Sequence, residues 1–402
     1  MSETMSSPYG GGVTKAQLVP HLAGLGTTIF AEMSALAVRT GAINLGQGFP
    51  DTDGPAAMAE AAAAAVVGGR GNQYPPGPGI PELREAIAQH QLNCYGLQWD
   101  PETEVLVTAG ATEGIAAAML ALVDQGDEVI ALEPFYDSYR ATIAMARGRC
   151  VPVRLHAPQF RLEEAALRAA VTEHTRIILL NSPHNPTGAV LSRGELEAVA
   201  RVAIEYDLTV VTDEVYEHLA FDEPHIPIAS LPGMKERTLT LSSAGKTFSF
   251  TGWKIGWATG PEELIAATRT TKQFLTFVSG GPFQYAVAEG LTKEMEWVAA
   301  QRSAMAARRE LLAGGLSQLG LTVHRPRGTY FVTTDARTLG WSDALAFCRA
   351  LPQRAGVVAI PCSAFYAQLD DEVKALVRWT FSKQAATLAR ALDQLAAADL
   401  VQ

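Results

Sequence analysis

Residues 176–214 read RIILLNSPHNPTGAVLSRGELEAVARVAIEYDLTVVTDE, and their pattern indicates the class of fold. It begins with an apolar run, continues with a helical pattern over 193–206, and ends with a second apolar run at 208–214. Strand, helix and strand in this order are typical of a βαβ unit, in which the two strands are parallel. The stretch therefore predicts an α/β protein with a mostly parallel sheet.

The same alternation continues on both sides of this unit. Further strands are expected at 104–108, 127–132 and 238–243, and further helices at 112–123 and 138–147. Continuous apolar runs of this kind indicate strands that are covered by helices on both faces of the sheet. In such sheets, ligands bind at the carboxyl ends of the strands.

The pattern changes after Pro282. Residues 283–316 predict a long helix without proline, and Gly290 is the expected place for a break in it. Short strands with helices between them follow in residues 321–365. We therefore expect four parts: a flexible N-terminus (1–14), an N-terminal segment that joins the small domain (15–54), a large domain (55–285) and a small α+β domain (286–402).

Composition and charge exclude several classes of function. The 402 residues are 48% hydrophobic, as in folded globular proteins, and the net charge of −10 argues against a nucleic-acid or membrane partner. The four cysteines form no C-x-x-C pair and match no zinc spacing, so no metal ligands are predicted. The N-terminus lacks a signal-peptide pattern, and the Ala-rich stretch 56–67 is too short to cross a bilayer. These features predict a cytoplasmic protein.

Polar side chains follow three of the expected strands. Asn185 and Asp213 follow the two strands of the quoted unit, with Tyr216 close behind. Lys246 follows the strand TLTLSS, within the stretch SSAGKTFSFTGWK at 242–254. Taken alone, each would be a turn residue, a helix cap or a solvated lysine. Because the carboxyl ends of parallel strands meet at one edge of a sheet, we expect these side chains to lie together.

The order Gly-Lys-Thr around Lys246 also invites a phosphate-loop interpretation. That motif needs a glycine five residues before the second one, and Thr240 occupies this position. An amine, a carboxylate, an amide and a phenol suit pyridoxal 5′-phosphate instead. Lysine forms a Schiff base with its aldehyde, and a carboxylate keeps its ring nitrogen protonated, so that the ring accepts electrons from a substrate carbanion.

The motifs NPTG, TDEVY and SSAGKTFSFTGWKIGW occur in an order that resembles class I aminotransferases, from about Phe30 to Lys383. Within this family the chain resembles the kynurenine, glutamine and methionine aminotransferase branch. The stretches FAEMSALA, NQYPPGPG, EPFYDSY and LNSPHNPTGAVL resemble the N-succinyldiaminopimelate aminotransferases of actinobacteria. The resemblance implies a fold type I PLP-dependent transferase, with a mostly parallel central sheet, helices on both faces and a smaller α+β domain.

The resemblance also implies roles for residues at matching positions. Lys246 is similar to the lysine that forms the Schiff base and later moves the substrate proton. Arg378, in LVRWTFSK, resembles the arginine that binds the substrate carboxylate, with Gly48 and Asn185 beside it. The implied cofactor-binding residues are Gly110, Ala111, Thr112, Tyr136, Asn185, Asp213, Tyr216, Ser243, Lys254 and, from the neighbouring subunit, Tyr74.

The implied reaction moves an amino group between an L-amino acid and a 2-oxo acid by a ping-pong mechanism. Because Tyr74 would reach the neighbouring site, a homodimer with shared active sites is expected. The specific expectation is N-succinyl-LL-2,6-diaminopimelate with 2-oxoglutarate, in lysine biosynthesis. Ser279-Gly280 stands where kynurenine-type enzymes often carry Phe-His, and the smaller residues suit a longer, polar substrate. The sequence does not reveal a cation for the succinyl carboxylate.

Four alternatives to this assignment were compared. Transamination of kynurenine, glutamine or methionine uses the same residues, and β-elimination from cysteine conjugates uses the same carbanion. An aminotransferase-like sensor fused to a DNA-binding domain is disfavoured, because fewer than 30 residues precede Phe30. A nicotinamide-dependent dehydrogenase is disfavoured, because no G-x-G-x-x-G motif follows a strand.

Overall fold

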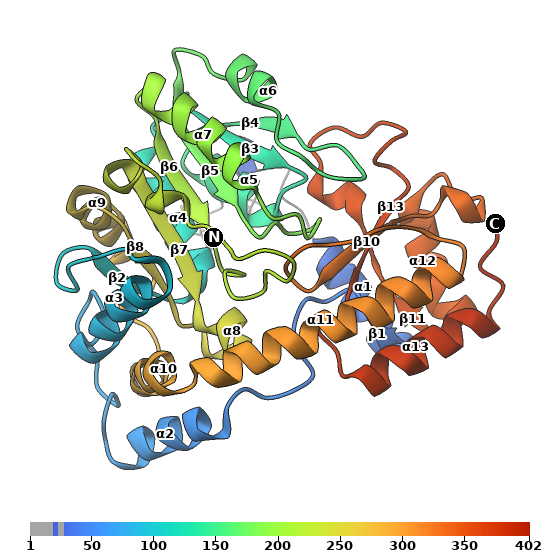
Figure 1. Ribbon diagram of the computed structural model, residues 1–402, viewed down its shortest axis with the longest axis horizontal. Coiled ribbons are helices and arrows are strands. Elements are labelled where there is room, and N and C mark those ends of the chain that lie inside the picture. Colours follow the sequence, from blue (N-terminus) through green and yellow to red (C-terminus); the bar gives the residue numbers. More distant parts are fainter. Residues whose placement is uncertain (1–18, 23–27) are drawn as a thin grey trace, which may run out of the picture.

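The computed structural model describes residues 19–22 and 28–402, so the expectation for residues 1–14 lies outside it. Its largest sheet has seven strands (Figure 1). Their spatial order is β2 (Val105–Thr108), β8 (Gly256–Thr259), β7 (Thr238–Ser243), β6 (Thr209–Asp213), β5 (Thr175–Asn181), β3 (Glu128–Glu133) and β4 (Arg149–Arg154). Neighbouring strands are parallel except at β8, which is antiparallel to β2 and β7. The mostly parallel sheet predicted from the sequence is confirmed.

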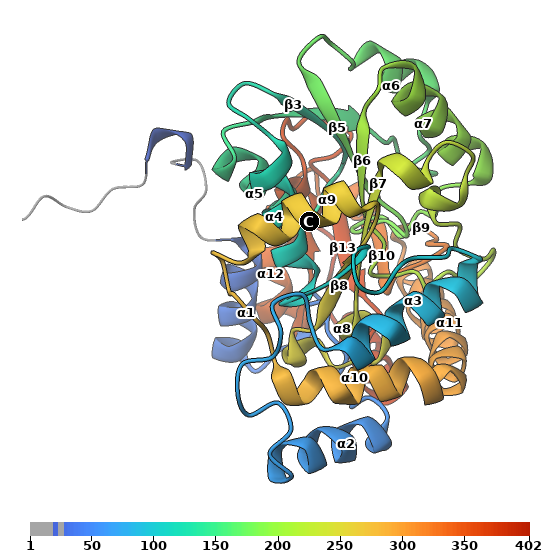
Figure 2. The same ribbon diagram turned by 90° about the vertical axis from the view of Figure 1, so that its left-hand side faces the viewer.

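Helices cover both faces of this sheet (Figure 2). In β5, Ile177 and Leu179 pack into the apolar cluster on one face, while Ile178 and Leu180 pack into the cluster on the other. Burial on both faces explains why this strand reads as a continuous apolar run. The covering helices are α4 (Gly110–Leu122), α5 (Asp137–Met145) and α9 (Glu262–Lys272) on one face, and α6 (Glu164–Ala169) and α7 (Arg193–Glu205) on the other.

Two strands of the large sheet were not foreseen in the sequence. The five expected strands agree with the structure to within one residue at each end. β4 contains Pro152 and lies at the sheet edge, where its side chains are only partly buried, so its sequence lacks an apolar run. β8 has four residues and begins at Gly256, whose α-carbon packs so closely on Gly110 that a Cβ would lie 2.6 Å from the Gly110 carbonyl carbon.

The long helix expected over 283–316 is two helices, and the break is not at the expected glycine. The helices are separated at Glu294, which has φ −110° and ψ 18°. Gly290 stays helical and packs on Met58, because a Cβ there would lie 2.5 Å from the Met58 sulfur. The glycine therefore permits close helix packing. The helices on this side of the molecule are α2 (Ala56–Val67), α3 (Pro81–Tyr95), α10 (Gly281–Lys293) and α11 (Met295–Gln318).

The C-terminal part of the chain builds a second, antiparallel sheet, in the order β12 (Ile360–Pro361), β13 (Leu376–Thr380), β10 (Phe331–Asp335) and β9 (Thr322–His324). The N-terminal segment joins this part, because β1 (Ile43–Asn44) pairs in parallel with β11 (Val357–Val358). The division into domains at 54/55 and 285/286 stays a prediction. The helices here are α1 (Ile29–Thr40), α12 (Ala344–Ala355) and α13 (Ala385–Ala397).

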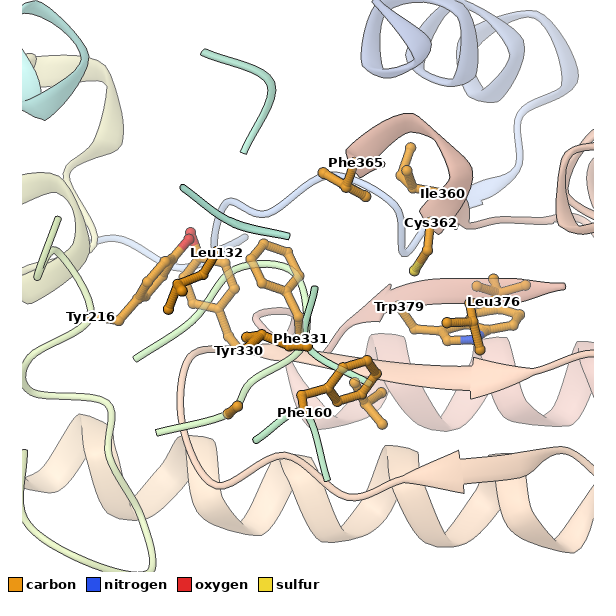
Figure 3. Packing of buried hydrophobic residues seen from close by; sticks show 14 of the residues in the cluster. Leu132, Phe160, Tyr216, Tyr330, Phe331, Ile360, Cys362, Phe365, Leu376 and Trp379 are labelled. Atoms are coloured by element: carbon orange, nitrogen blue, oxygen red, sulfur yellow. The ribbon is translucent and has the colours of Figure 1, made fainter. Parts of the chain in front are cut away.

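One apolar cluster joins the two sheets (Figure 3). It includes Leu132 from β3, Phe331 from β10 and Trp379 from β13. No helix in the described part of the chain is long and apolar enough to span a membrane. The remaining short helices are η1 (Pro20–Leu22), η2 (Ile228–Ser230), η3 (Lys235–Arg237), α8 (Ala244–Thr247), η4 (Thr251–Trp253), η5 (Arg337–Leu339) and η6 (Cys362–Phe365).

Candidate active site

The carboxyl ends of the parallel strands open into one cavity of about 470 Å³. The strand register brings these ends level, since Asn181 at the end of β5 is paired with Asp213 at the end of β6. Twelve of the thirteen site residues predicted from the sequence line this cavity. They are Gly48, Gly110, Ala111, Thr112, Tyr136, Asn185, Asp213, Tyr216, Ser243, Lys246, Lys254 and Arg378.

Tyr74 is the predicted residue that the structure does not bring to this cavity. Its side chain is 82% exposed and packs edge-to-face on Phe277, with ring centroids 5.6 Å apart. A role in a neighbouring subunit's site agrees with this exposure. That role stays a prediction.

Lys246 lies on the short helix α8, directly after β7. Its Nζ donates to the hydroxyl of Tyr330 over 2.7 Å and lies 3.5 Å from the carbonyl oxygen of Gly48. The Tyr330 hydroxyl in turn donates to the same carbonyl. Tyr330 was not foreseen, because it lies 84 residues from Lys246 and no motif links the two. Its ring packs edge-to-face on Tyr216, with centroids 5.1 Å apart (Figure 3).

Asp213 provides a buried carboxylate at the end of β6, with 5% of the residue exposed. Its Oδ2 accepts a hydrogen bond of 2.6 Å from the Tyr139 hydroxyl, and its Oδ1 accepts one of 3.3 Å from the N–H of Val215. Burial raises the pKa of Asp213, and these hydrogen bonds oppose the rise only in part. No ion pair to Asp213 forms within residues 28–402, so the site could accept a cationic group beside this carboxylate. Tyr139 was missed, although it stands one helical turn after Tyr136 in EPFYDSY.

The first turn of α4 and Lys254 form a cradle for an anion. Ala109, the N-cap residue of α4, makes no side-chain capping bond, and the free N–H groups and dipole of a helix N-terminus favour a negative charge. Gly110 has φ +75°, and a Cβ there would lie 3.0 Å from Lys254 Nζ. The ammonium group thus lies against the start of the helix. Ser243, at the end of β7, adds a hydroxyl to the same cavity.

Arg378 lies on β13 and is 2% exposed. One terminal nitrogen donates to the Asn185 side-chain oxygen over 3.0 Å, and the other donates to the Gly46 carbonyl oxygen over 2.8 Å. Its Nε is buried and has no hydrogen-bond partner within the described ranges. Burial lowers the pKa of Arg378 to about 10, which leaves the guanidinium charged at neutral pH. A charged group with an unused N–H donor suits an incoming carboxylate.

Aromatic rings position this guanidinium. The central carbon of Arg378 lies 4.0 Å from the ring centroid of Phe331, 4.9 Å from that of Phe365 and 5.1 Å from that of Phe30. Gly48 lies against the same wall, and a Cβ there would be 2.4 Å from the Phe331 ring. Phe30 and Phe331 line the cavity and were not among the predicted site residues. Rings at these distances hold the cation in place without competing for its hydrogen bonds.

One cavity therefore combines an amine, a buried carboxylate, an anion cradle and a guanidinium whose Nε has no hydrogen-bond partner in the described residues. The model of the family "Aminotransferase class I and II" matches residues 40–395. The chain belongs to this family. As a member it is an aminotransferase, and its similarity to solved aminotransferase structures confirms the fold type I architecture expected above.

Known relatives cover almost the whole chain. The chain is 55% identical to the probable N-succinyldiaminopimelate aminotransferase DapC of Mycobacterium tuberculosis, over 95% of this chain and 98% of the relative. The solved structure of that enzyme matches with a TM-score of 0.93 over 95% of this chain and 100% of that chain. The methionine aminotransferase of Escherichia coli is 40% identical, over 95% and 99% of the two chains. Human kynurenine–oxoglutarate transaminase 1 is 37% identical, over 93% and 96%.

Proposed function

We propose that this aminotransferase uses pyridoxal 5′-phosphate to move an amino group between N-succinyl-LL-2,6-diaminopimelate and 2-oxoglutarate. The observation that carries the substrate assignment is the 55% identity, over 95% of the chain, to the DapC relative. Identity to the methionine and kynurenine enzymes is lower, at 40% and 37%. Those two substrates therefore form the second candidate.

The residues of the cavity fit the cofactor. Bound pyridoxal phosphate supplies an aldehyde for amines and a ring that accepts electrons from a carbanion. The cradle of Gly110 and Lys254 suits its phosphate, and the buried Asp213 carboxylate suits a protonated ring nitrogen. Two lysines line the cavity, and Lys254 belongs to the anion cradle. We therefore assign the other, Lys246, as the amine that reacts with the aldehyde.

The substrate would be held through its α-carboxylate by Arg378. Its Nε and one terminal nitrogen offer two parallel N–H groups, and Asn185 keeps the guanidinium in place. Once the substrate amine has replaced it at the aldehyde carbon, Lys246 Nζ would take the proton from the substrate Cα and pass it to that carbon. Binding the carboxylate firmly keeps the Cα within reach of this amine.

A homodimer would complete the site. Tyr74 and Phe274 are 82% and 81% exposed, and Phe277 is about half exposed beside them. Exposed rings in one area are typical of an interface between proteins. We propose that this area contacts a second copy of the chain and places Tyr74 near the partner's cofactor phosphate. All four cysteines are free thiols, which agrees with a reducing cytoplasm.

The substrate assignment is tested by half-reactions of the cofactor-loaded enzyme. The protein is mixed with one amino donor at a time, and the loss of cofactor absorbance is followed without an acceptor. We expect rapid loss with N-succinyl-LL-2,6-diaminopimelate and glutamate, and loss at least tenfold slower with methionine and kynurenine. Faster loss of cofactor absorbance with methionine or kynurenine would favour the second candidate function. Release of pyruvate and ammonia from a cysteine conjugate would instead indicate β-elimination.

A further inference from the structure

A second cavity, of about 260 Å³, is lined by the two residues that follow Tyr216 along the chain, Glu217 and His218. His90, on α3, packs edge-to-face on His218, with an angle of 75° between the ring planes and centroids 5.0 Å apart. Within the described residues, these three side chains form the one group of His, Cys, Asp and Glu whose ligand atoms lie within 4.8 Å of one another. The proposed reaction uses none of them.

The contact between the two imidazoles requires that one of the two facing nitrogens is unprotonated. His90 Nε2 and His218 Nε2 are 2.9 Å apart, so at most one of them carries a proton and the other offers a lone pair. An imidazole with a free lone pair is the form that binds a metal ion. Both rings are largely shielded, since His90 is 3% exposed and the His218 side chain 14% exposed.

Glu217 adds a carboxylate whose negative charge lacks a fixed partner. Its side chain is 1% exposed, and one of its oxygens accepts from the Ser242 hydroxyl. The other oxygen lies 4.0 Å from His218 Nε2. No lysine or arginine forms an ion pair with Glu217 in the described part of the chain. A carboxylate buried in this way is costly unless a cation lies beside it.

We propose that His90 Nε2, His218 Nε2 and the Glu217 carboxylate bind one divalent transition-metal ion of the zinc type. Two imidazole nitrogens and one carboxylate oxygen are a common zinc ligand set, with water as the fourth ligand. The cavity beside Glu217 and His218 gives access for the ion and room for this water. Two nitrogen ligands of tetrahedral zinc are about 3.3 Å apart, so the two rings need to separate by a few tenths of an ångström.

The ring of His90 can make this movement. Its Nδ1 is buried and has no hydrogen-bond partner within the described ranges, so no bond from that nitrogen fixes the ring. The Glu217 oxygen that Ser242 does not bond lies 4.0 Å from His218 Nε2, and the Tyr95 hydroxyl beside Glu217 would share this carboxylate with the ion. Arg302 also lines the cavity, and it forms no ion pair with Glu217 in the described residues. The bound ion would connect α3 to the segment that carries Tyr216.

The site is not visible in the sequence. His90 and His218 are 128 residues apart, and neither belongs to a zinc-ligand pattern. The expectation that the chain has no metal ligands was drawn from its cysteine spacing alone. The two histidines become neighbours only because α3 packs beside the segment after β6.

Metal content tests the proposal directly. The full-length, cofactor-loaded enzyme is treated with a chelator and then dialysed against zinc chloride, and the retained zinc is measured. We expect one zinc ion per chain, bound at least tenfold more weakly by His90→Gln and by His218→Gln. His174→Gln is the matched control, because His174 is an exposed surface histidine 3.8 Å from Glu173. Its zinc content should equal that of the wild type.

Circular dichroism and cofactor absorbance show whether the two variants fold. If one of these variants does not fold, X-ray absorption at the zinc edge of the wild type replaces the measurement on that variant. We then expect two imidazole nitrogens and one carboxylate oxygen around the ion. A wild type that retains no zinc overturns the proposal. So does equal retention in folded His90→Gln and His218→Gln, or a shell made of water oxygens alone. None of these outcomes alters the transamination assignment, which the half-reactions test separately.

Discussion

Arg378 has a hydrogen-bond donor that the described part of the chain does not use. Two of its nitrogens are bonded to protein oxygens, and the buried Nε is left without a partner in the described residues. Leaving a buried donor unpaired costs about 1–3 kcal/mol. A carboxylate bound at this position would remove the cost, so the unpaired donor favours an anion here.

Replacing Arg378 by lysine keeps the positive charge and removes the two parallel donors. A hydrogen bond to a charged group contributes about 1.5–3 kcal/mol, so kcat/KM should fall about 10- to 150-fold for every amino acid tested, mainly through KM. Cofactor absorbance should remain. Arg176→Lys, at a position with 53% of the side chain exposed, is the control and should leave KM unchanged. An unchanged KM in Arg378→Lys would place the carboxylate site elsewhere.

Tyr330 positions the amine of Lys246 through a single hydroxyl. Tyr330→Phe keeps the ring that packs on Tyr216 and removes the oxygen that accepts from Lys246 Nζ. One lost hydrogen bond to a charged group should lower kcat by about tenfold or more, with little change in KM. Steady-state kinetics measure this, with Tyr206→Phe, at a half-exposed tyrosine, as the control. A variant with wild-type kcat would show that the hydroxyl has no part in catalysis.

At the scale of elements, α7 shows how a helix start is fixed. Ser192 caps the helix, and Glu195 Oε2 accepts from the Ser192 N–H over 2.8 Å. Glu195 Oε1 accepts from the N–H of Leu162 over 2.8 Å. Burial alone would raise the pKa of Glu195, but these hydrogen bonds and the nearby Arg161 outweigh it and leave the pKa lowered. The carboxylate thus stabilises the fold as long as it is ionised.

Ser192→Ala should lower the free energy of unfolding by about 1 kcal/mol at pH 7, as measured by urea denaturation, because it removes the cap.

Glu195→Gln tests how the stability of the protein depends on pH. The pKa of the Glu195 carboxyl group is lower in the folded protein than in the unfolded chain, where it is about 4.3. The stabilisation by Glu195 is therefore present above about pH 4.3 and is lost as the pH falls through the pKa of the folded state. The stability difference between wild type and Glu195→Gln should therefore shrink below about pH 4. A constant difference would contradict this account.

The same elements explain what the sequence could predict. β5 and β6 were located to within one residue, because strands buried on both faces give an unbroken apolar run. β8 has only four residues and no such run, so its existence depends on its two neighbours. The break at Glu294 has no glycine or proline at its own position, so the sequence carries no signal that locates it there.

The residues of the site also divide into those that the sequence predicts and those that it does not. Residues at strand ends, such as Asp213 and Lys246, were predictable because the parallel topology alone brings strand ends together. The contacts of Tyr139 with Asp213 and of Tyr330 with Lys246 join residues 74 and 84 positions apart. Such contacts depend on side-chain packing between elements, which periodicity does not encode.

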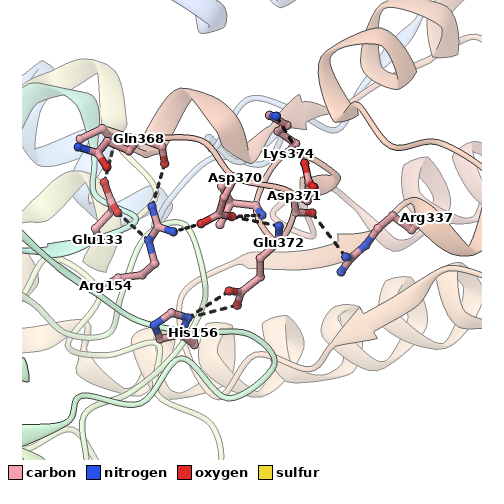
Figure 4. Close-up of polar contacts among 11 residues, drawn as sticks. Glu133, Arg154, His156, Arg337, Gln368, Asp370, Asp371, Glu372 and Lys374 are labelled. Carbon is pink, nitrogen blue, oxygen red and sulfur yellow. Dashed lines mark hydrogen bonds and ion pairs between the residues drawn. The ribbon is translucent and has the colours of Figure 1, made fainter.

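At the scale of the whole molecule, ion pairs connect the edge of the large sheet to the segment that precedes β13 (Figure 4). Arg154, on β4, bonds to Glu133 over 3.0 Å and to the carbonyl oxygen of Gln368 over 2.8 Å, and it also pairs with Asp370. His156 lies 3.2 Å from Glu372 beside them. This network holds the segment that leads into β13, the strand that carries Arg378.

Asp370→Asn should loosen this connection. The Asp370 side chain is half exposed, and exposed ion pairs contribute about 0.2–1 kcal/mol, so local opening should become about 1.4- to fivefold more frequent. Hydrogen–deuterium exchange of residues 366–375 measures this, and high salt should reduce the difference from wild type. Asp371→Asn is the control, since Asp371 is fully exposed and its ion pair, with Lys374, lies within the segment and does not reach the large sheet. Equal exchange in wild type and Asp370→Asn would show that the network does not restrain the segment.

Lys246 is the lysine that we assign to pyridoxal phosphate, and every other proposed role depends on this assignment. The direct measurement is reduction of the cofactor-loaded enzyme with borohydride, followed by digestion and mass spectrometry. We expect the added mass of the reduced cofactor on Lys246, and no added mass after the same treatment of Lys246→Ala. The added mass on Lys254, or on any other lysine of the wild type, would contradict the account.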